Sequence, residues 1–195
     1  MTASHWRALA IAGHTGDVAT ARAAIHDDDP VARELAIGAL ERAGALGDDE
    51  LRTALADPHP TVRRRAVGIA ARRPGVDLLP SLHDADPAVV EAAAWAAGEH
   101  ETVPDEVLHE LVRLASDADD ALVREASVAA LGAIGDPRGL PAILTACADK
   151  PAIRRRAVLA LAPFEGPEVD AALDTALHDR DWQVRQAAED VAPEA

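Results

Sequence analysis

VREASVAALGAIGD, at residues 123–136, is the clearest copy of a pattern that recurs along the whole chain. Each copy opens on a small or branched apolar residue, continues with Ala-rich apolar residues at helical spacing, and often ends in Gly. The copies are spaced by 27–34 residues, and the first of them is degenerate. They begin at Ser4, Ala32, Val62, Val89, Val123, Ile153 and Val184.

The residues before each copy predict where its helix begins. Asp precedes the copies at 32, 89, 123 and 184 by three positions, and Pro stands two positions before those at 32, 62, 89 and 153. A carboxylate accepts from the free N–H groups of the first turn, and Pro in that turn loses no needed donor. A second, shorter helical pattern precedes the caps, at 18–26, 49–56, 104–115, 137–148 and 167–178. Each unit is therefore predicted to be a helix, a tight turn and a helix, in about 30 residues.

The turn Asp and Pro, the Val-Arg that opens the second helix, and the Ala-Leu-Gly…Ile-Gly-Asp that follows resemble the HEAT repeat. The similarity is greatest to the short, phycobilisome-lyase-type HEAT-like repeats. This resemblance implies an all-α, right-handed α-solenoid of about six and a half helix pairs, with the second helices lining a concave face. We expect one domain, 1–195, with repeats at about 1–16, 17–45, 46–74, 75–100, 101–135, 136–165 and 166–195.

Composition excludes several classes of protein. The 195 residues carry 19 Lys and Arg against 34 Asp and Glu, a net charge of −15, and only 2% are aromatic. One cysteine, Cys147, excludes an internal disulfide and a cysteine-cluster metal site. No apolar run is long enough for a membrane span, and the first residues do not read as a signal peptide. We expect a soluble, cytoplasmic monomer that does not bind membranes.

An arginine follows the first residue of five copies: Arg33, Arg63, Arg124, Arg154 and Arg185. Such a stripe could bind an anionic ligand, or each arginine could pair with turn aspartates of its own or the next repeat. Because one structural position holds all five, we favour the ion pairs, which the HEAT resemblance also implies.

Positions +2, +3, +6 and +10 of each copy, counted from its first residue, are predicted to face away from the packed side of the second helix. They hold seven arginines and five acids, a basic balance in a chain of net charge −15. Trp95 is either an aromatic binding anchor beside arginine or a half-buried filler between alanines. The candidate binding residues on this face are Trp95, Arg64, Arg65, Arg72, Arg42, Glu91, Glu99, Arg155, Arg156 and Trp6.

The sequence contains no nucleophile motif, phosphate-binding glycine loop or paired-carboxylate motif. His100-Glu101 and His109-Glu110 resemble the His-Glu pairs of deoxyhypusine hydroxylase, a di-iron HEAT-repeat enzyme. That family carries such pairs at matching positions of several repeats, whereas here they fall at unmatched positions. We therefore predict no enzymatic activity, no metal and no cofactor.

The best prediction of function is a non-enzymatic protein–protein interaction scaffold that binds a segment of a partner protein on its concave face. The first alternative is a HEAT-like protein that binds nucleic acid, similar to the alkylpurine glycosylases, but the net acidity disfavours it. A lesser alternative, a lyase-like or chaperone-like factor, depends only on the subfamily resemblance.

Overall fold

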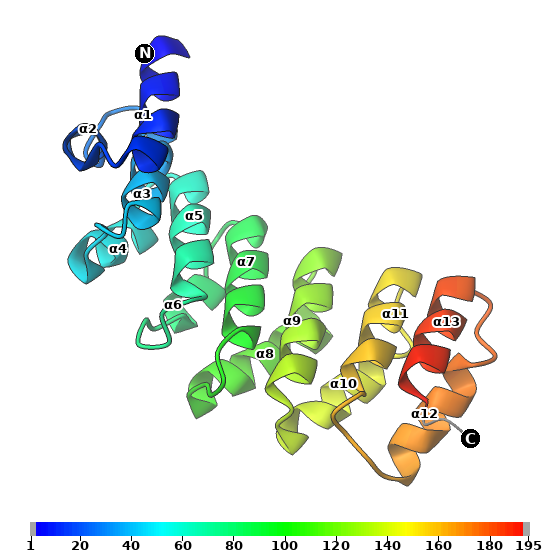
Figure 1. Cartoon of the computed structure of the whole chain (residues 1–195). Coiled ribbons are helices and arrows are strands. Elements are labelled where there is room, and N and C mark those ends of the chain that lie inside the picture. Colours follow the sequence, from blue (N-terminus) through cyan, green and yellow to red (C-terminus); the bar gives the residue numbers. More distant parts are fainter. Residues whose placement is uncertain (1–2, 193–195) are drawn as a thin grey trace. The chain divides into compact units, whose positions relative to one another are not determined.

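The computed structural model describes residues 3–192, and all regular structure in that range is helical (Figure 1). The chain forms two compact units, one up to Val76 and one from Asp77. The first contains α1 (Ala3–Thr15), α2 (Val18–Ala24), α3 (Pro30–Arg42), α4 (Asp48–Leu55) and α5 (Pro60–Ala70). The second contains α6 (Leu79–Leu82), α7 (Pro87–Gly98), α8 (Asp105–Asp117), α9 (Ala121–Ile134), the 3-10 turn η1 (Pro137–Gly139), α10 (Leu140–Ala146), α11 (Pro151–Ala160), α12 (Pro167–Ala176) and α13 (Trp182–Val191).

The second helices of the repeats are the odd-numbered ones, α1, α3, α5, α7, α9, α11 and α13. They begin where the sequence predicts. The carboxylates of Asp29, Asp86, Asp120 and Asp181 accept hydrogen bonds from backbone N–H groups in the first turns of α3, α7, α9 and α13. His59 uses a ring nitrogen for the same purpose at α5. The all-α repeat fold of the solenoid class is confirmed.

The first helices, α2, α4, α6, α8, α10 and α12, vary more in length. The predicted helix at 137–148 is split into η1 and α10, because Pro141 has no N–H to bond the carbonyl four residues earlier. In the repeat at 75–100 the first helix is the single turn α6, which follows Pro74 and Gly75 and contains Pro80. The long spacing before Val123 is taken up by the 13-residue α8.

Each unit has its core between its first and second helices. The fully buried side chains are mostly Leu and Ile, and Ala fills the contacts between helices. In the first unit the largest are Leu9, Leu40 and Leu51, and in the second they are Leu82, Leu108, Leu111, Leu131, Ile143, Ile153 and Leu161.

Neighbouring second helices approach one another through glycine and alanine. A Cβ atom placed on Gly132 of α9 would lie 2.7 Å from the Cα of Ala160 in α11, and one on Gly98 of α7 would lie 2.9 Å from the Cα of Ala130 in α9. Gly13 of α1 makes an equivalent approach to α3. Three of the seven copies thus place glycine at position +9, where the next helix comes too close for a side chain.

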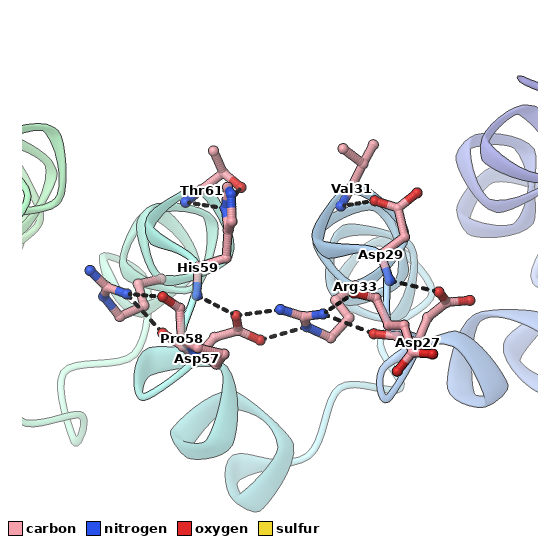
Figure 2. Close-up of polar contacts among 10 residues, drawn as sticks. Asp27, Asp29, Val31, Arg33, Asp57, Pro58, His59 and Thr61 are labelled. Atoms are coloured by element: carbon pink, nitrogen blue, oxygen red, sulfur yellow. Dashed lines mark hydrogen bonds and ion pairs between the residues drawn. The ribbon is translucent and has the colours of Figure 1, made fainter. Parts of the chain in front are cut away.

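An arginine at position +1 joins each of three turns to the next. Figure 2 shows Arg33, whose Nε and Nη2 donate to the two carboxylate oxygens of Asp57, both at 2.7 Å. Its Nη1 donates to the carbonyl of Asp27 in its own turn, at 2.8 Å. Asp57 in turn accepts the N–H of His59, the residue that caps α5. One guanidinium therefore holds two successive turns in register.

The same bridge recurs in the second unit. Arg124 binds Asp149 with its Nε at 2.8 Å, and Arg154 binds Asp179 with its Nε at 2.8 Å and its Nη2 at 2.7 Å. Arg63 and Arg185 donate to carbonyls of their own turns. The predicted pairing with turn aspartates is confirmed for Arg33, Arg124 and Arg154, so their guanidinium groups serve the stack and not a ligand.

These bridges predict a dependence of stability on pH. The hydrogen bonds from Arg154 hold the pKa of Asp179 below its ordinary value of 3.8. A folded-state pKa below the unfolded one stabilises the fold at neutral pH, and this stabilisation is lost as the pH falls below about 4. We expect Asp179→Asn to lower the free energy of unfolding at pH 7 by about 1–2 kcal/mol and to reduce its further loss at pH 3, measured by urea denaturation. Asp105→Asn, which removes an exposed partner of Arg138, should change the free energy by less than about 0.5 kcal/mol. Equal effects of the two variants would contradict the role of the bridge.

The close helix contacts predict opposite effects of two Gly→Ala substitutions. Gly132→Ala puts a methyl group 2.6 Å from the Cβ of Ala160, and should destabilise the protein by about 1–3 kcal/mol. Gly68 of α5 has no atom within 4 Å of the equivalent position, so Gly68→Ala should stabilise by about 0.5–1 kcal/mol through helix propensity. Thermal denaturation followed by circular dichroism measures both. A Gly132→Ala melting temperature equal to or above that of the wild type would show that α9 and α11 are not held this close.

Candidate binding groove

The second unit has a groove of about 480 Å³ that crosses α7, α9 and α11. Its small lining residues, here called its floor, are Gly98 of α7 and Ala126, Ala129, Ala130 and Ala133 of α9. Its larger lining residues, here called its walls, are Glu91, Trp95 and Glu99 from α7 and its C-terminal end, Leu122 and Glu125 from α9, and Arg156 from α11.

The groove exists because α9 carries alanine at two positions where a neighbouring second helix carries a large side chain. Position +3 is Arg65 in α5 and Arg156 in α11, but it is Ala126 in α9. Position +6 is Trp95 in α7, but it is Ala129 in α9. Since the backbones of α7, α9 and α11 are held close together by Gly98 and Gly132, these truncated side chains leave a hollow with taller walls.

Two large apolar side chains on the walls are open to solvent. Trp95 is 49% exposed and Leu122 is 57% exposed. Trp95 is thus half-buried, which fits both interpretations of the sequence, the binding anchor and the half-buried filler between alanines. An indole that stands beside an alanine floor offers a large apolar surface to any group that enters the groove.

The lining of the groove is acidic, with three glutamates against one arginine. The Nε of Arg156 lies 3.7 Å from the Oε1 of Glu125, so these two charges offset each other across the α9–α11 contact. Within the described residues, Glu91 and Glu99 have no ion-pair partner. They stand one helical turn before and after Trp95.

The candidate residues from the sequence divide between the two units, and none of them is buried. The groove brings together Glu91, Trp95, Glu99 and Arg156. Arg155 lies on the same helix as Arg156 but does not line the groove. The remaining candidates lie in the first unit: Trp6, Arg42, Arg64, Arg65 and Arg72.

Three of the candidates in the first unit are engaged within it. The indole N–H of Trp6 donates to the capping carboxylate of Asp29 at 2.8 Å. The guanidinium group of Arg42 lies over Gly13, and that of Arg65 lies over Gly38. Arg64 and Arg72 are exposed.

The predicted basic balance of this helix face does not hold in the groove. Of the face positions counted from the sequence, the first unit holds five arginines and one acid, whereas the second unit holds two arginines and four acids. The net charge summed over both units does not reveal this segregation.

The sequence analysis did not find Leu122 as a wall residue. The alanines of the floor are visible in the aligned repeats as a row of small residues in one copy, beside Glu125.

The residues weighed for chemistry have structural partners. Glu110 of the His109-Glu110 pair is bound by Arg113 and by His83, and the hydrogen bonds from Arg113 lower the pKa of its carboxyl. Burial raises the pKa of the Cys147 thiol to about 11, so it is protonated at neutral pH.

In the part of the chain that the structure describes, no group of three or more His, Cys, Asp or Glu is placed to hold a metal ion. No helix there is both long and apolar enough to cross a membrane.

Comparison with known families identifies the repeats. A family model described as HEAT repeats matches residues 49–131, 75–162 and 129–192, which together cover most of the chain. The protein belongs to the HEAT-repeat family. The assignment of this HEAT-repeat protein to the short, phycobilisome-lyase-type subgroup stays a prediction. A search of the curated proteins found no match to it.

Solved structures share the fold of this HEAT-repeat protein at low identity. A designed armadillo repeat protein in complex with peptide (KR)4 is 18% identical, with a TM-score of 0.64 over 89% of this chain and 96% of that one. An engineered protein is 20% identical, with a TM-score of 0.64 and the same coverage. Human deoxyhypusine hydroxylase is 19% identical, with a TM-score of 0.50 over 96% of this chain and 77% of that one.

Proposed function

We propose that the protein is a non-enzymatic interaction module that binds a segment of another protein across its second helices, with the groove around Trp95 as the principal site. The observation that carries the proposal is a half-exposed tryptophan beside a hollow with an alanine floor. Aromatic anchors that stand in or beside a pocket supply most of the binding energy in many protein interfaces.

The dimensions of the groove suit side chains of a bound segment. Its volume of about 480 Å³ lies in the usual range of binding pockets, roughly 300–1,000 Å³. Repeat proteins present extended surfaces of this kind, on which successive side chains of a partner can bind successive repeats. The complex of a designed armadillo repeat protein with a peptide supports this class of ligand for the fold.

The acidic lining disfavours the nucleic-acid alternative for this groove. Nucleic-acid affinity depends on cations that neutralise phosphates, and here three glutamates face one arginine that is already paired. No particular observation favours a lyase-like or chaperone-like factor. The predictions of a monomer in the cytoplasm, without a cofactor, accompany the proposal unchanged.

Substitution of Trp95 tests the proposal. Peptides selected by the full chain from a random displayed library should lose affinity for Trp95→Ala by roughly thirtyfold, the effect of about 2 kcal/mol of lost contact at a hot spot. Fluorescence anisotropy with the selected peptides measures this. The matched control is Trp182→Ala, because Trp182 is 64% exposed and lies at the start of α13, outside the groove.

Two results would contradict the proposed function. One is selected peptides that bind Trp95→Ala as tightly as the wild type, and the other is a library from which no peptide is enriched. A selected ligand whose binding falls steeply with salt and is competed by single-stranded DNA would favour the nucleic-acid alternative.

A further inference from the structure

At two contacts between second helices, the Glu at position +2 of one helix faces the Arg at position +3 of the next. In the first unit the Nε of Arg65 lies 3.9 Å from the Oε1 of Glu34, between α5 and α3. In the second unit the Nε of Arg156 lies 3.7 Å from the Oε1 of Glu125, between α11 and α9.

The contact between α7 and α9 has the glutamate of this pair without the arginine. Glu91 stands at position +2 of α7, and position +3 of α9 is Ala126. Both residues line the groove, so the space that an arginine side chain fills elsewhere is part of the hollow. Glu91 therefore lines a hollow at the place where two other contacts hold a guanidinium group.

Arg65 shows what a guanidinium group in that place touches. A Cβ atom on Gly38, at position +6 of the preceding helix, would lie 3.2 Å from Nη2 and 3.3 Å from Nε of Arg65. Position +6 of α7 is Trp95. A guanidinium group placed beside Glu91 as Arg65 is placed beside Glu34 would thus lie against the side chain of Trp95. Glu99, one turn further along, adds a second carboxylate to the same wall.

We propose that the groove binds an arginine side chain of a partner protein, in the place of the arginine that the repeat lacks at Ala126. The inference rests on the proposed function and names the chemistry of its ligand. A planar guanidinium group can bond a carboxylate through two N–H groups and stack on an indole at once, whereas the lysine ammonium is a more strongly hydrated point charge. The site accordingly prefers arginine to lysine.

The test uses the full chain and a fluorescein-labelled peptide, acetyl-(Arg-Ser)4-amide, with binding followed by anisotropy at 150 mM salt. The deciding variant is Ala126→Arg, which restores the side chain that position +3 carries in α5 and α11 and fills the groove. It should weaken peptide binding by about tenfold or more, because the new arginine would form an ion pair with Glu91 and cover Trp95. Glu91→Gln, which leaves the groove open, should also weaken binding.

The control for charge is Ala171→Arg, on the exposed surface of α12 and outside the groove. It makes the same change in net charge, and should alter affinity by less than about threefold because exposed charges at this salt are screened within roughly 8 Å. A peptide with citrulline for arginine keeps the planar shape of the side chain but loses its charge, and a carbonyl oxygen replaces one of its donor nitrogens, so it should bind at least about tenfold more weakly.

Three outcomes would overturn the inference: equal weakening by Ala126→Arg and Ala171→Arg, equal binding of the citrulline peptide, or equal or tighter binding of a peptide with lysine in place of each arginine, acetyl-(Lys-Ser)4-amide. The first would mean attraction to the acidic surface as a whole. If peptides selected from the random library depend on Trp95 while the arginine peptide does not bind, the arginine site fails and the proposed function stands. Circular dichroism of Ala126→Arg and Glu91→Gln confirms that each variant is folded.

Discussion

The bidentate bond between an arginine of one second helix and an aspartate of the next turn sets the spacing of these repeats. Arg33, Arg124 and Arg154 each bind a carboxylate of the following turn and a carbonyl of their own. Arg154 and Asp179 are only 9% and 15% exposed, so this pair is screened less by water than a surface ion pair. Since a repeat protein has no single large core, such contacts between neighbours contribute much of its stability.

Glycine and alanine at the contacts between second helices complete this constraint. With the backbones as close as Gly132 and Ala160 require, the side chains on the outward face have little freedom to rearrange. The size of a residue at position +3 or +6 then decides whether the surface is filled or hollow. Arg65 and Arg156 fill their contacts, while Ala126 leaves a groove under Trp95. Small residues at both positions of one helix, between helices with larger ones, are thus enough to make a hollow.

The same face carries opposite charge in the two units. The arginines of the first unit are partly held by their own repeats, Arg65 beside Glu34 and Arg42 over Gly13. In the groove of the second unit the glutamates outnumber the arginine, and two of them lack an ion-pair partner among the described residues. In the proposed function, the glutamates would select a ligand by its charge and Trp95 would bind it by apolar contact.

The sequence by itself determined the repeats, the starts of the second helices and the arginine–aspartate bridges. These features depend on residues close in the chain, such as Asp29 with Val31, or on one repeat length, such as Arg33 with Asp57, so a periodic pattern reveals them. The sequence also placed Trp95, Glu91, Glu99 and Arg156 on the side of the second helices that faces away from the packed core. Only the tertiary structure decided that these four line one groove, while Trp6 donates a hydrogen bond to Asp29 in the first unit and Arg155 does not line the groove. The reason is that a hollow forms where the side chains of one helix are smaller than those of the helices on either side. It therefore depends on three adjacent helices and cannot be found from one repeat.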